Sequence, residues 1–186
     1  MEKNLFIDTG RLIIRPFETE DYDQWNEGFN NRLPSQYKYD DGFSEDSSTY
    51  TKEWFADWIQ GFNAAAENDE MYILGVFRKE DGANVGKVEL ITIRRMDYDW
   101  AMMGYSIHNQ YFRQGYGKES VLAASALFFD ELNFNRIELH INMDNEPSKK
   151  LALSTGFRYE CTREAFSYEN GKWTDFQIYY KNRVNK

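Results

Sequence analysis

Apolar residues recur along this chain with two periods, one typical of strands and the other of helices. Alternating or short continuous apolar runs, bounded by turn residues, indicate strands. On this basis we expect strands at residues 11–17, 71–78, 85–94, 100–107, 136–141, 157–168 and 173–180. Asp81-Gly82 and Glu169-Asn170-Gly171 separate neighbouring runs and predict tight hairpin turns. The pattern therefore predicts a sheet of about seven strands.

Apolar residues three or four positions apart predict helices with one buried face. This spacing is found in two groups: Trp54, Trp58, Phe62 and Ala65 within residues 47–66, and Val121, Ala124, Phe128 and Leu132 in the segment after residue 117. Thr19 is expected to cap a helix near the N-terminus. A short helix is expected from Asn145 to Gly156, because Asn favours helix starts and Gly favours helix ends. The element order predicts an α/β (α+β) fold, with a mixed sheet that carries helices on its faces.

The composition favours one compact domain over residues 1–186, because no repeat or linker interrupts the chain. The aromatic residues expected in its core are Trp25, Trp54, Trp58, Phe128, Phe129 and Phe157. The mean hydropathy is −0.75 and no long apolar run occurs, so we expect neither a membrane span nor a signal peptide. The single cysteine, Cys161, excludes an internal disulfide and is expected in the core of a cytoplasmic protein. Two histidines and one cysteine give no zinc-ligand spacing, so we expect no metal.

The charge balance limits the partners that the chain can bind. The net charge is −9, which argues against binding along nucleic acid. Many carboxylates fall in the N-terminal third: Glu18, Glu20, Asp21, Asp23, Glu27, Asp40, Asp41, Glu45, Asp46, Glu53 and Asp57. Two interpretations remain open, a solvated acidic face and a field that attracts a cationic substrate such as an amine or a basic peptide.

A glycine-rich turn over residues 113–119 joins the strand at 100–107 to the following helix. Backbone amides at a helix start converge on anions at the positive end of the helix dipole, which predicts a phosphate site. Taken alone, Gly-x-Gly before a helix more often marks a tight turn. No Gly-Lys-Ser/Thr triplet and no third glycine follow, which excludes a P-loop and disfavours a dinucleotide fold.

Two motifs in order support the phosphate interpretation. Gly104-Tyr105 is followed by the turn at 115–119, and Asn145-x-x-Ser148 is followed by Leu-Ser-Thr-Gly-Phe at 153–157. Together with the opening at 12–17, they resemble the GNAT acyltransferase superfamily. Within it they resemble the branch that acetylates the N-termini of ribosomal proteins (RimJ/RimL-like). The resemblance spans nearly the whole chain and implies a splayed, mostly antiparallel sheet of about seven strands with helices on both faces.

The chain departs from the superfamily pattern at two positions. Phe112 stands three residues before Gly115, where Gln or Arg is frequent. Ala152 occupies the place in the last helix where many members carry a tyrosine that protonates the departing thiolate. The proton donor must therefore be sought elsewhere.

The resemblance implies acetyl-CoA as co-substrate. Its pyrophosphate would be held by the backbone amides of a six-residue turn: Arg113, Gln114, Gly115, Tyr116, Gly117 and Lys118. The N–H of Ile107 would hydrogen-bond the thioester carbonyl as negative charge develops there. Asn145 has two interpretations, a helix cap and a hydrogen-bond partner of the pantetheine amide.

The resemblance also suggests candidates for the catalytic groups. Ser148 would protonate the departing thiolate, although a helix-start serine also bonds locally. His108 and Glu89 are candidate general bases, each with a purely structural alternative. His140 is expected to point away from the cofactor, because it neighbours Leu139 on one strand.

The resulting hypothesis is an acetyl-CoA-dependent N-acetyltransferase in which an amine attacks directly within a ternary complex. The preferred acceptor is a protein or peptide N-terminal α-amino group, with a basic protein N-terminus among the candidates. The expected protein is a monomer or homodimer with no nucleic-acid or membrane partner. Two alternatives stay open: transfer to a small amine (polyamine, amino acid or aminoglycoside), and an acyl-CoA-binding module without turnover.

Overall fold

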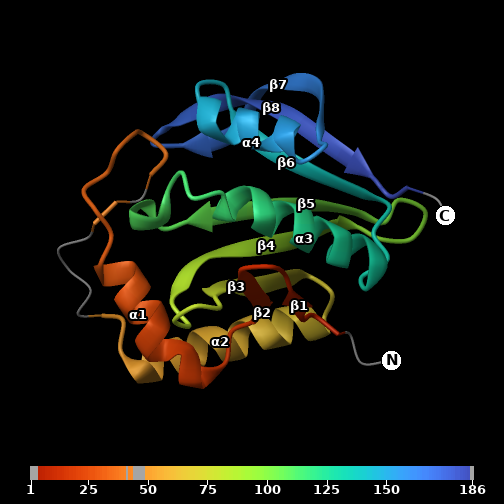
Figure 1. Cartoon of the computed structure of the whole chain (residues 1–186). Helices are drawn as coiled ribbons and strands as arrows, with labels where there is room; N and C mark the ends of the chain where they lie inside the picture. Colours follow the sequence, from red (N-terminus) through yellow and green to blue (C-terminus); the bar gives the residue numbers. More distant parts are fainter. Residues whose placement is uncertain (1–3, 41, 44–48, 185–186) are drawn as a thin grey trace.

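The computed structural model describes residues 4–40, 42–43 and 49–184, which form an eight-stranded sheet with helices on both faces (Figure 1). The strand order is β1-β2-β3-β4-β5-β6-β8-β7, and neighbours are antiparallel except β5 and β6. The strands are β1 (Ile7–Asp8), β2 (Leu12–Pro16), β3 (Met71–Arg78), β4 (Asn84–Arg94), β5 (Trp100–Ile107), β6 (Arg136–Asn142), β7 (Arg158–Glu169) and β8 (Lys172–Asn182). The helices are α1 (Tyr22–Asn30), α2 (Lys52–Glu67), α3 (Tyr116–Asp130) and α4 (Glu146–Ser154).

The predicted fold class is confirmed, with eight strands in place of about seven. The additional strand, β1, contains two residues, which is too short for a periodic pattern. The strands predicted at 71–78 and 100–107 have the predicted bounds, because each is a continuous run ended by turn residues. Within the described residues, no helix combines the length and apolar character needed to cross a bilayer.

Both predicted starts of the N-terminal helices need correction. Thr19 does not cap α1: it lies inside a short 3-10 helix, and the Glu18 amide donates to the Asp21 carboxylate at 2.8 Å. Because of this hydrogen bond, the turn begins at Glu18, one residue before Thr19. The helix α2 begins at Lys52, where Thr51 accepts from the Trp54 amide at 3.2 Å. Ser47, the predicted start of that helix, lies outside the described residues, as do Asp41, Glu45 and Asp46 of the acidic N-terminal third.

The sheet buries two separate cores. The larger core lies between the sheet and α3 and α4, and contains the predicted stripe of Val121, Ala124, Phe128 and Leu132. The smaller lies on the other face against α1 and α2, and consists of Phe17, Trp25, Phe55, Ile59, Ile73 and Phe77. The buried face of α2 therefore differs from the predicted one. Phe55 and Ile59 point inward, while Trp54 and Trp58 pack at its edge against Trp25.

Cys161 was expected in the core but is half-buried. It lies on β7, which is the last strand of the sheet and therefore has a neighbour on one side only. The prediction treated a small apolar residue as buried without knowing that its strand would be at the edge.

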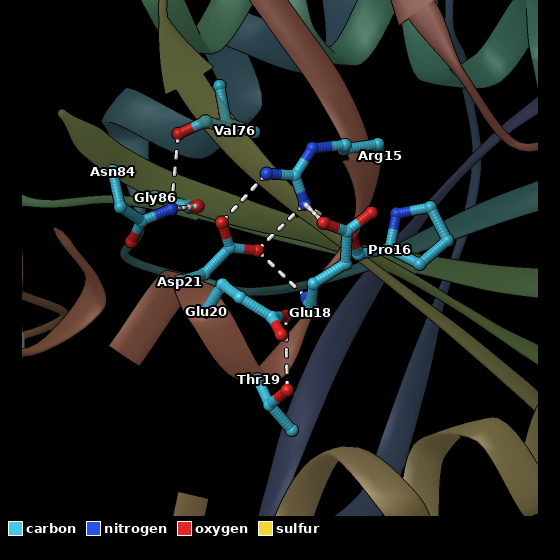
Figure 2. A network of polar contacts seen from close by, with 9 residues as sticks. All are labelled: Arg15, Pro16, Glu18, Thr19, Glu20, Asp21, Val76, Asn84 and Gly86. Carbon is cyan, nitrogen blue, oxygen red and sulfur yellow. Dashed lines mark hydrogen bonds and ion pairs between the residues drawn. The ribbon is translucent and has the colours of Figure 1, made fainter. Parts of the chain in front are cut away.

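An ion pair joins β2 to the start of α1 (Figure 2). The two terminal nitrogens of the Arg15 guanidinium, Nη1 and Nη2, each donate to one Asp21 carboxylate oxygen at 2.7 Å. The Arg15 guanidinium also lies 4.5 Å from the centre of the Phe77 ring. Asp21 is 6% exposed, so this ion pair closes the end of the smaller core.

The strands β5 and β6 pair over a short distance and then separate. Their parallel pairing covers Trp100–Met102 on β5 and Arg136–Glu138 on β6. Beyond these residues the two strands have no mutual pairing, so the sheet divides into two antiparallel ribbons, β1–β5 and β6–β8. The starts of α3 and α4 follow the free ends of β5 and β6 (Figure 1). This division produces the opening in which the candidate site lies.

Candidate active site

A cleft of about 610 Å³ lies at the open end of β5. Five segments contribute to its walls: residues 105–107 at the end of β5, 108–112, the turn at 113–118, the start of α4 at 145–151 and the segment at 32–40 after α1. All the predicted cofactor-binding residues line it except Gln114, whose side chain points toward Gln110 O at 3.5 Å. The structure thus brings together residues far apart in sequence.

One end of the cleft presents backbone amides to an incoming anion. Gly115 is the N-cap of α3 with φ of +85°, and Arg113 has φ of +61°, both in the left-handed region. Among the described residues, no acceptor receives a hydrogen bond from the amides of residues 113–118. The amide of Glu119 is the next along the chain, and it donates to Gly115 O at 3.1 Å. A run of unpaired amides at the positive end of a helix is suited to a phosphate group.

The turn is supported from behind by Arg11, which immediately precedes β2. Arg11 Nη2 lies 2.7 Å from Glu119 Oε2, and Arg11 Nη1 donates to Gln114 O at 2.9 Å. Burial raises the pKa of Glu119, but hydrogen bonds from Thr9 and Arg11 outweigh it and lower the pKa overall. The ionised Glu119 therefore holds Arg11 against the turn, and Arg11 in turn holds the carbonyl of Gln114.

The backbone of β5 offers a donor toward the gap between β5 and β6. The His108 amide donates to Val85 O at 2.9 Å, so it points toward β4. Because amide direction alternates along an antiparallel strand, the N–H of Ile107 points away from β4. Ile107 lines the cleft, which is the placement expected of a donor to a thioester carbonyl.

The start of α4 forms the opposite wall. Asn145 caps the helix, since its Oδ1 accepts from the Ser148 amide at 3.2 Å. The cap interpretation is thus confirmed, while the predicted contact of Asn145 with pantetheine stays a prediction. The Ser148 hydroxyl lies 2.7 Å from the Tyr105 hydroxyl. Ala152 is fully buried in the larger core.

Tyr105 is a site residue that the sequence prediction missed. It was noted only as part of the Gly-Tyr motif, which gave no sign that its hydroxyl reaches α4. Burial raises the pKa of Tyr105 to about 12, although the hydrogen bond with Ser148 acts in the opposite direction. The phenol therefore stays protonated over the working range of an enzyme.

The surroundings of His108 argue against its predicted role as a general base. Arg32 Nε donates to His108 Nδ1 at 3.0 Å, and His108 Nε2 lies 3.2 Å from Asn84 Oδ1. Both ring nitrogens are therefore occupied, and Nδ1 accepts, so the proton is on Nε2. Burial, together with the charge of Arg32, lowers the pKa of His108 to about 3. A base this weak binds no proton near neutral pH.

A test of His108 follows from its folded and unfolded titration. An unfolded histidine has a pKa of about 6.5, so between that pH and 3 the unfolded chain binds more protons. The stabilisation that His108 contributes is therefore fully present above about pH 6.5, and the free energy of unfolding decreases as the pH falls. We expect the parent to lose about 2 kcal/mol of unfolding free energy relative to His108→Gln between pH 7 and 5. Urea denaturation at both pH values measures this difference, and parallel profiles would contradict the assignment.

Glu89, the other predicted base, lies on β4 outside the cleft wall. It pairs across the sheet with Gly104, and a Cβ on Gly104 would lie 2.6 Å from Glu89 Oε1. Its carboxylate also lies 2.6 Å from Lys87 Nζ. Glu89 opposes Ile73 of the smaller core, so it faces the side of the sheet that carries α1 and α2. His140 bonds Glu138 on the strand face opposite Leu139, as expected.

The segment at 32–40 covers the cleft from the side of α1, and the sequence pattern did not assign it to the site. Its Lys38 Nζ lies 2.9 Å from Asp144 Oδ2, and the Tyr39 hydroxyl donates to the same carboxylate. Asn109 Nδ2 donates to Leu33 O at 2.6 Å. These bonds attach the segment to the end of β5 and to the turn before α4. In Figure 1 the segment is the orange loop that leaves α1. In the part of the chain described, no group of three or more His, Cys, Asp or Glu is placed to hold a metal.

Residues 11–158 match the acetyltransferase (GNAT) domain, which is most of the chain. The chain belongs to the GNAT acetyltransferase family. It is therefore an acetyl-CoA-dependent acyltransferase, and the resemblance found in the sequence is confirmed.

Two Bacillus proteins are similar over nearly the whole chain. The uncharacterized N-acetyltransferase YoaA of Bacillus subtilis (strain 168) is 25% identical over 93% of this chain and 94% of its own length. The uncharacterized N-acetyltransferase p20 of Bacillus licheniformis is 25% identical over 92% of each protein. The two matches therefore cover nearly all of each relative.

Solved structures share the fold and include ribosomal-protein acetyltransferases. A provisionally assigned ribosomal-protein-serine acetyltransferase from Vibrio cholerae superposes with a TM-score of 0.75 and 25% identity, over 98% of this chain and 100% of its own. The ribosomal-protein-S5-alanine acetyltransferase from Vibrio fischeri gives 0.77 at 19% identity, over 96% and 97%. RimJ of Mycobacterium smegmatis, solved with CoA-disulfide, gives 0.75 at 18% identity, over 92% and 81%. The likeness to the Vibrio cholerae protein supports the RimJ/RimL-like branch, and the other two structures show that the fold is shared.

Proposed function

We propose that this GNAT protein is an N-acetyltransferase that transfers the acetyl group of acetyl-CoA to the α-amino group of a protein or peptide. The observation that carries the proposal is a single cleft with unpaired amides at one end and a Ser148–Tyr105 pair at the other. The RimJ structure similar to this chain is described with CoA-disulfide bound. The ribosomal-protein acetyltransferases among the similar structures favour a protein acceptor over a small one.

The residues of the cleft fit acetyl-CoA, which would supply the acetyl group as a thioester. The amides of residues 113–118 would hold its pyrophosphate, with the side chains of Arg113 and Lys118 at the same wall. The outward N–H of Ile107 would bond the thioester carbonyl, whose oxygen gains negative charge in the transition state. Asn145 and Ser148 would lie beside the pantetheine arm and the sulfur.

The reaction we propose has no covalent enzyme intermediate. The neutral amine nitrogen bonds to the carbonyl carbon, the carbon–sulfur bond breaks, and the sulfur takes its electron pair and a proton. An α-amino group has a pKa of about 7.7–8.0, so roughly a fifth or more is neutral near pH 7.4. A lysine side chain near 10.4 is neutral in only about one molecule in a thousand. An α-amino acceptor therefore requires little help from a base.

Of the two bases expected from the sequence, Glu89 is the one we retain, because His108 is occupied at both ring nitrogens. Glu89 lies on β4 beside Gly104, one residue from Tyr105, and its side chain is 27% exposed and paired with Lys87. We propose that Glu89 accepts the amine proton through water. The excess of acidic residues in the chain favours a basic acceptor peptide.

Two measurements on the same preparation test this function. Coenzyme A at a hundred times its Kd is expected to stabilise the protein by about 2.7 kcal/mol, seen as a higher melting temperature. Acetyl-CoA with a basic peptide that has a free N-terminus is then expected to release thiol. The same peptide with a blocked N-terminus but intact lysines is expected to release none.

Each alternative gives a different result in this assay. Faster thiol release with spermidine, an amino acid or an aminoglycoside than with the peptide would replace the protein acceptor by a small amine. Stabilisation by CoA without release by any amine would leave an acyl-CoA-binding module.

In the same assay Glu89→Gln should slow thiol release at pH 7 while leaving the stabilisation by CoA unchanged. An unchanged rate would remove Glu89 as base.

A further inference from the structure

The contact between Tyr105 and Ser148 joins two elements across the cleft. The two hydroxyl oxygens lie 2.7 Å apart, and the Tyr105 hydroxyl also lies 3.3 Å from the Ser148 carbonyl oxygen. Both residues line the cleft. Tyr105 comes from the end of β5 and Ser148 from the first turn of α4, so the pair forms only when both walls are in place.

A serine alone is a poor proton donor to a thiolate. A thiol has a pKa of about 8.5, and an aliphatic hydroxyl is a far weaker acid than either a thiol or a phenol. A serine that gave its proton to sulfur would become an alkoxide in a partly buried site, which is strongly unfavourable. A second proton that moves to the serine oxygen in the same step reduces this difficulty, because the base that forms is then a phenolate in place of the much stronger base, an alkoxide.

The hydrogen bonds of Ser148 leave its proton available for transfer. Among the described residues its hydroxyl oxygen has one partner, the phenol of Tyr105. When the phenol donates to that oxygen, the serine proton is free to turn toward the cleft. The Asn145 cap fixes the backbone of Ser148, so the direction of the hydroxyl is set by Tyr105.

We propose that Tyr105 positions Ser148 and resupplies its proton, so that the two hydroxyls form a relay to the departing sulfur. As the carbon–sulfur bond breaks, the Ser148 proton passes to sulfur and the Tyr105 proton passes to the Ser148 oxygen. The phenolate then takes a proton from solvent, which balances the proton lost by the amine. The proposal rests on the acetyltransferase function above. Tyr105 thereby provides a phenol in place of the tyrosine that many family members carry in the last helix, where this chain has the fully buried Ala152.

The test is Tyr105→Phe, which keeps the ring and removes the hydroxyl. General acid catalysis typically contributes about 10²–10⁴-fold, and Ser148 keeps its own proton, so we expect kcat to fall about 10- to 100-fold. The Kd of coenzyme A by calorimetry is expected to stay within about twofold, because the phosphate-binding turn is untouched. The matched control is Tyr22→Phe, which removes a phenol that donates to Tyr50 O at 2.8 Å on the other face of the sheet. It is expected to behave as the parent.

A second readout does not depend on turnover. The thiolate of bound coenzyme A absorbs in the ultraviolet, so its titration gives the pKa of the bound thiol. Hydroxyls that donate to the thiolate lower that pKa. We expect a higher thiol pKa in Tyr105→Phe than in the parent, and a higher one again in Ser148→Ala. The double variant is expected to match Ser148→Ala in both thiol pKa and kcat, since the two groups act as a unit.

Parent activity in Tyr105→Phe, or additive losses in the double variant, would overturn the relay while leaving the acetyltransferase function intact. Absence of thiol release from the parent itself would overturn the function instead. Should Tyr105→Phe fold poorly, Ser148→Ala still decides the proposal, because an unchanged thiol pKa there would show that no hydroxyl donates to sulfur.

Discussion

Replacing Gly115 by valine is expected to weaken coenzyme A binding at least tenfold. Gly115 has φ of +85° at the N-cap of α3, and a residue with a Cβ loses roughly 1–2 kcal/mol in that conformation, more when β-branched. The chain can relieve the strain by changing the turn, and the amides of residues 113–118 then no longer converge. Since about 1.4 kcal/mol corresponds to tenfold in affinity, a modest distortion is enough. Calorimetric titration with coenzyme A measures the change.

Gly171→Val is the matched control. Gly171 has φ of +83° in the turn between β7 and β8, and no heavy atom lies within 4 Å of a Cβ built there. The value of φ is therefore nearly the same as at Gly115, but no residue of this turn lines the cleft. We expect this variant to lose stability yet to bind coenzyme A as the parent does. Equal affinity in Gly115→Val and Gly171→Val would contradict the assignment of the turn as the pyrophosphate site.

Asp21→Asn is expected to be the most destabilising of the conservative changes considered. Removing one partner of a buried ion pair typically costs about 3–5 kcal/mol, because the other charge stays buried. The Arg15 side chain is 23% exposed, so we expect the lower end, about 3 kcal/mol. For a domain of this size that corresponds to roughly 6–12 °C in melting temperature. Thermal and urea denaturation would both detect it.

The control for this change is Asp23→Asn, two residues along the chain. Asp23 pairs with Lys52 at 3.0 Å, but both side chains are mostly exposed. Such surface pairs contribute about 0–1 kcal/mol, so the melting temperature should move little. Similar losses in Asp21→Asn and Asp23→Asn would mean that the network in Figure 2 does not anchor α1 as described.

The sequence was most informative where structure follows from local pattern. The bounds of β3 and β5 were predicted because each is a continuous apolar run between turn residues. The start of α1 was mispredicted because the bond between Glu18 and Asp21 competes with the cap expected at Thr19. A phosphate site could be predicted at the turn over residues 113–118, because such a site depends on neighbouring backbone amides and on glycines within a few residues.

The site beyond that turn depends on contacts between distant parts of the chain. Arg32 reaches His108 across 76 positions, and this contact with burial makes the ring a weak base. Tyr105 reaches Ser148 across 43 positions. Nothing in the local sequence around His108 or Tyr105 reveals these partners. The chemistry of the two side chains could therefore not be judged from residue type alone.

The short parallel joint between β5 and β6 has a mechanical consequence. Hydrogen bonds of three residue pairs connect two ribbons, each of which is stiffened by long antiparallel ladders. We therefore expect the angle between the two ribbons to change more readily than the shape of either ribbon. Acetyl-CoA bound against both ribbons would fix the angle between them. Amide hydrogen exchange should then slow most at the paired residues of β5 and β6, away from the atoms that react.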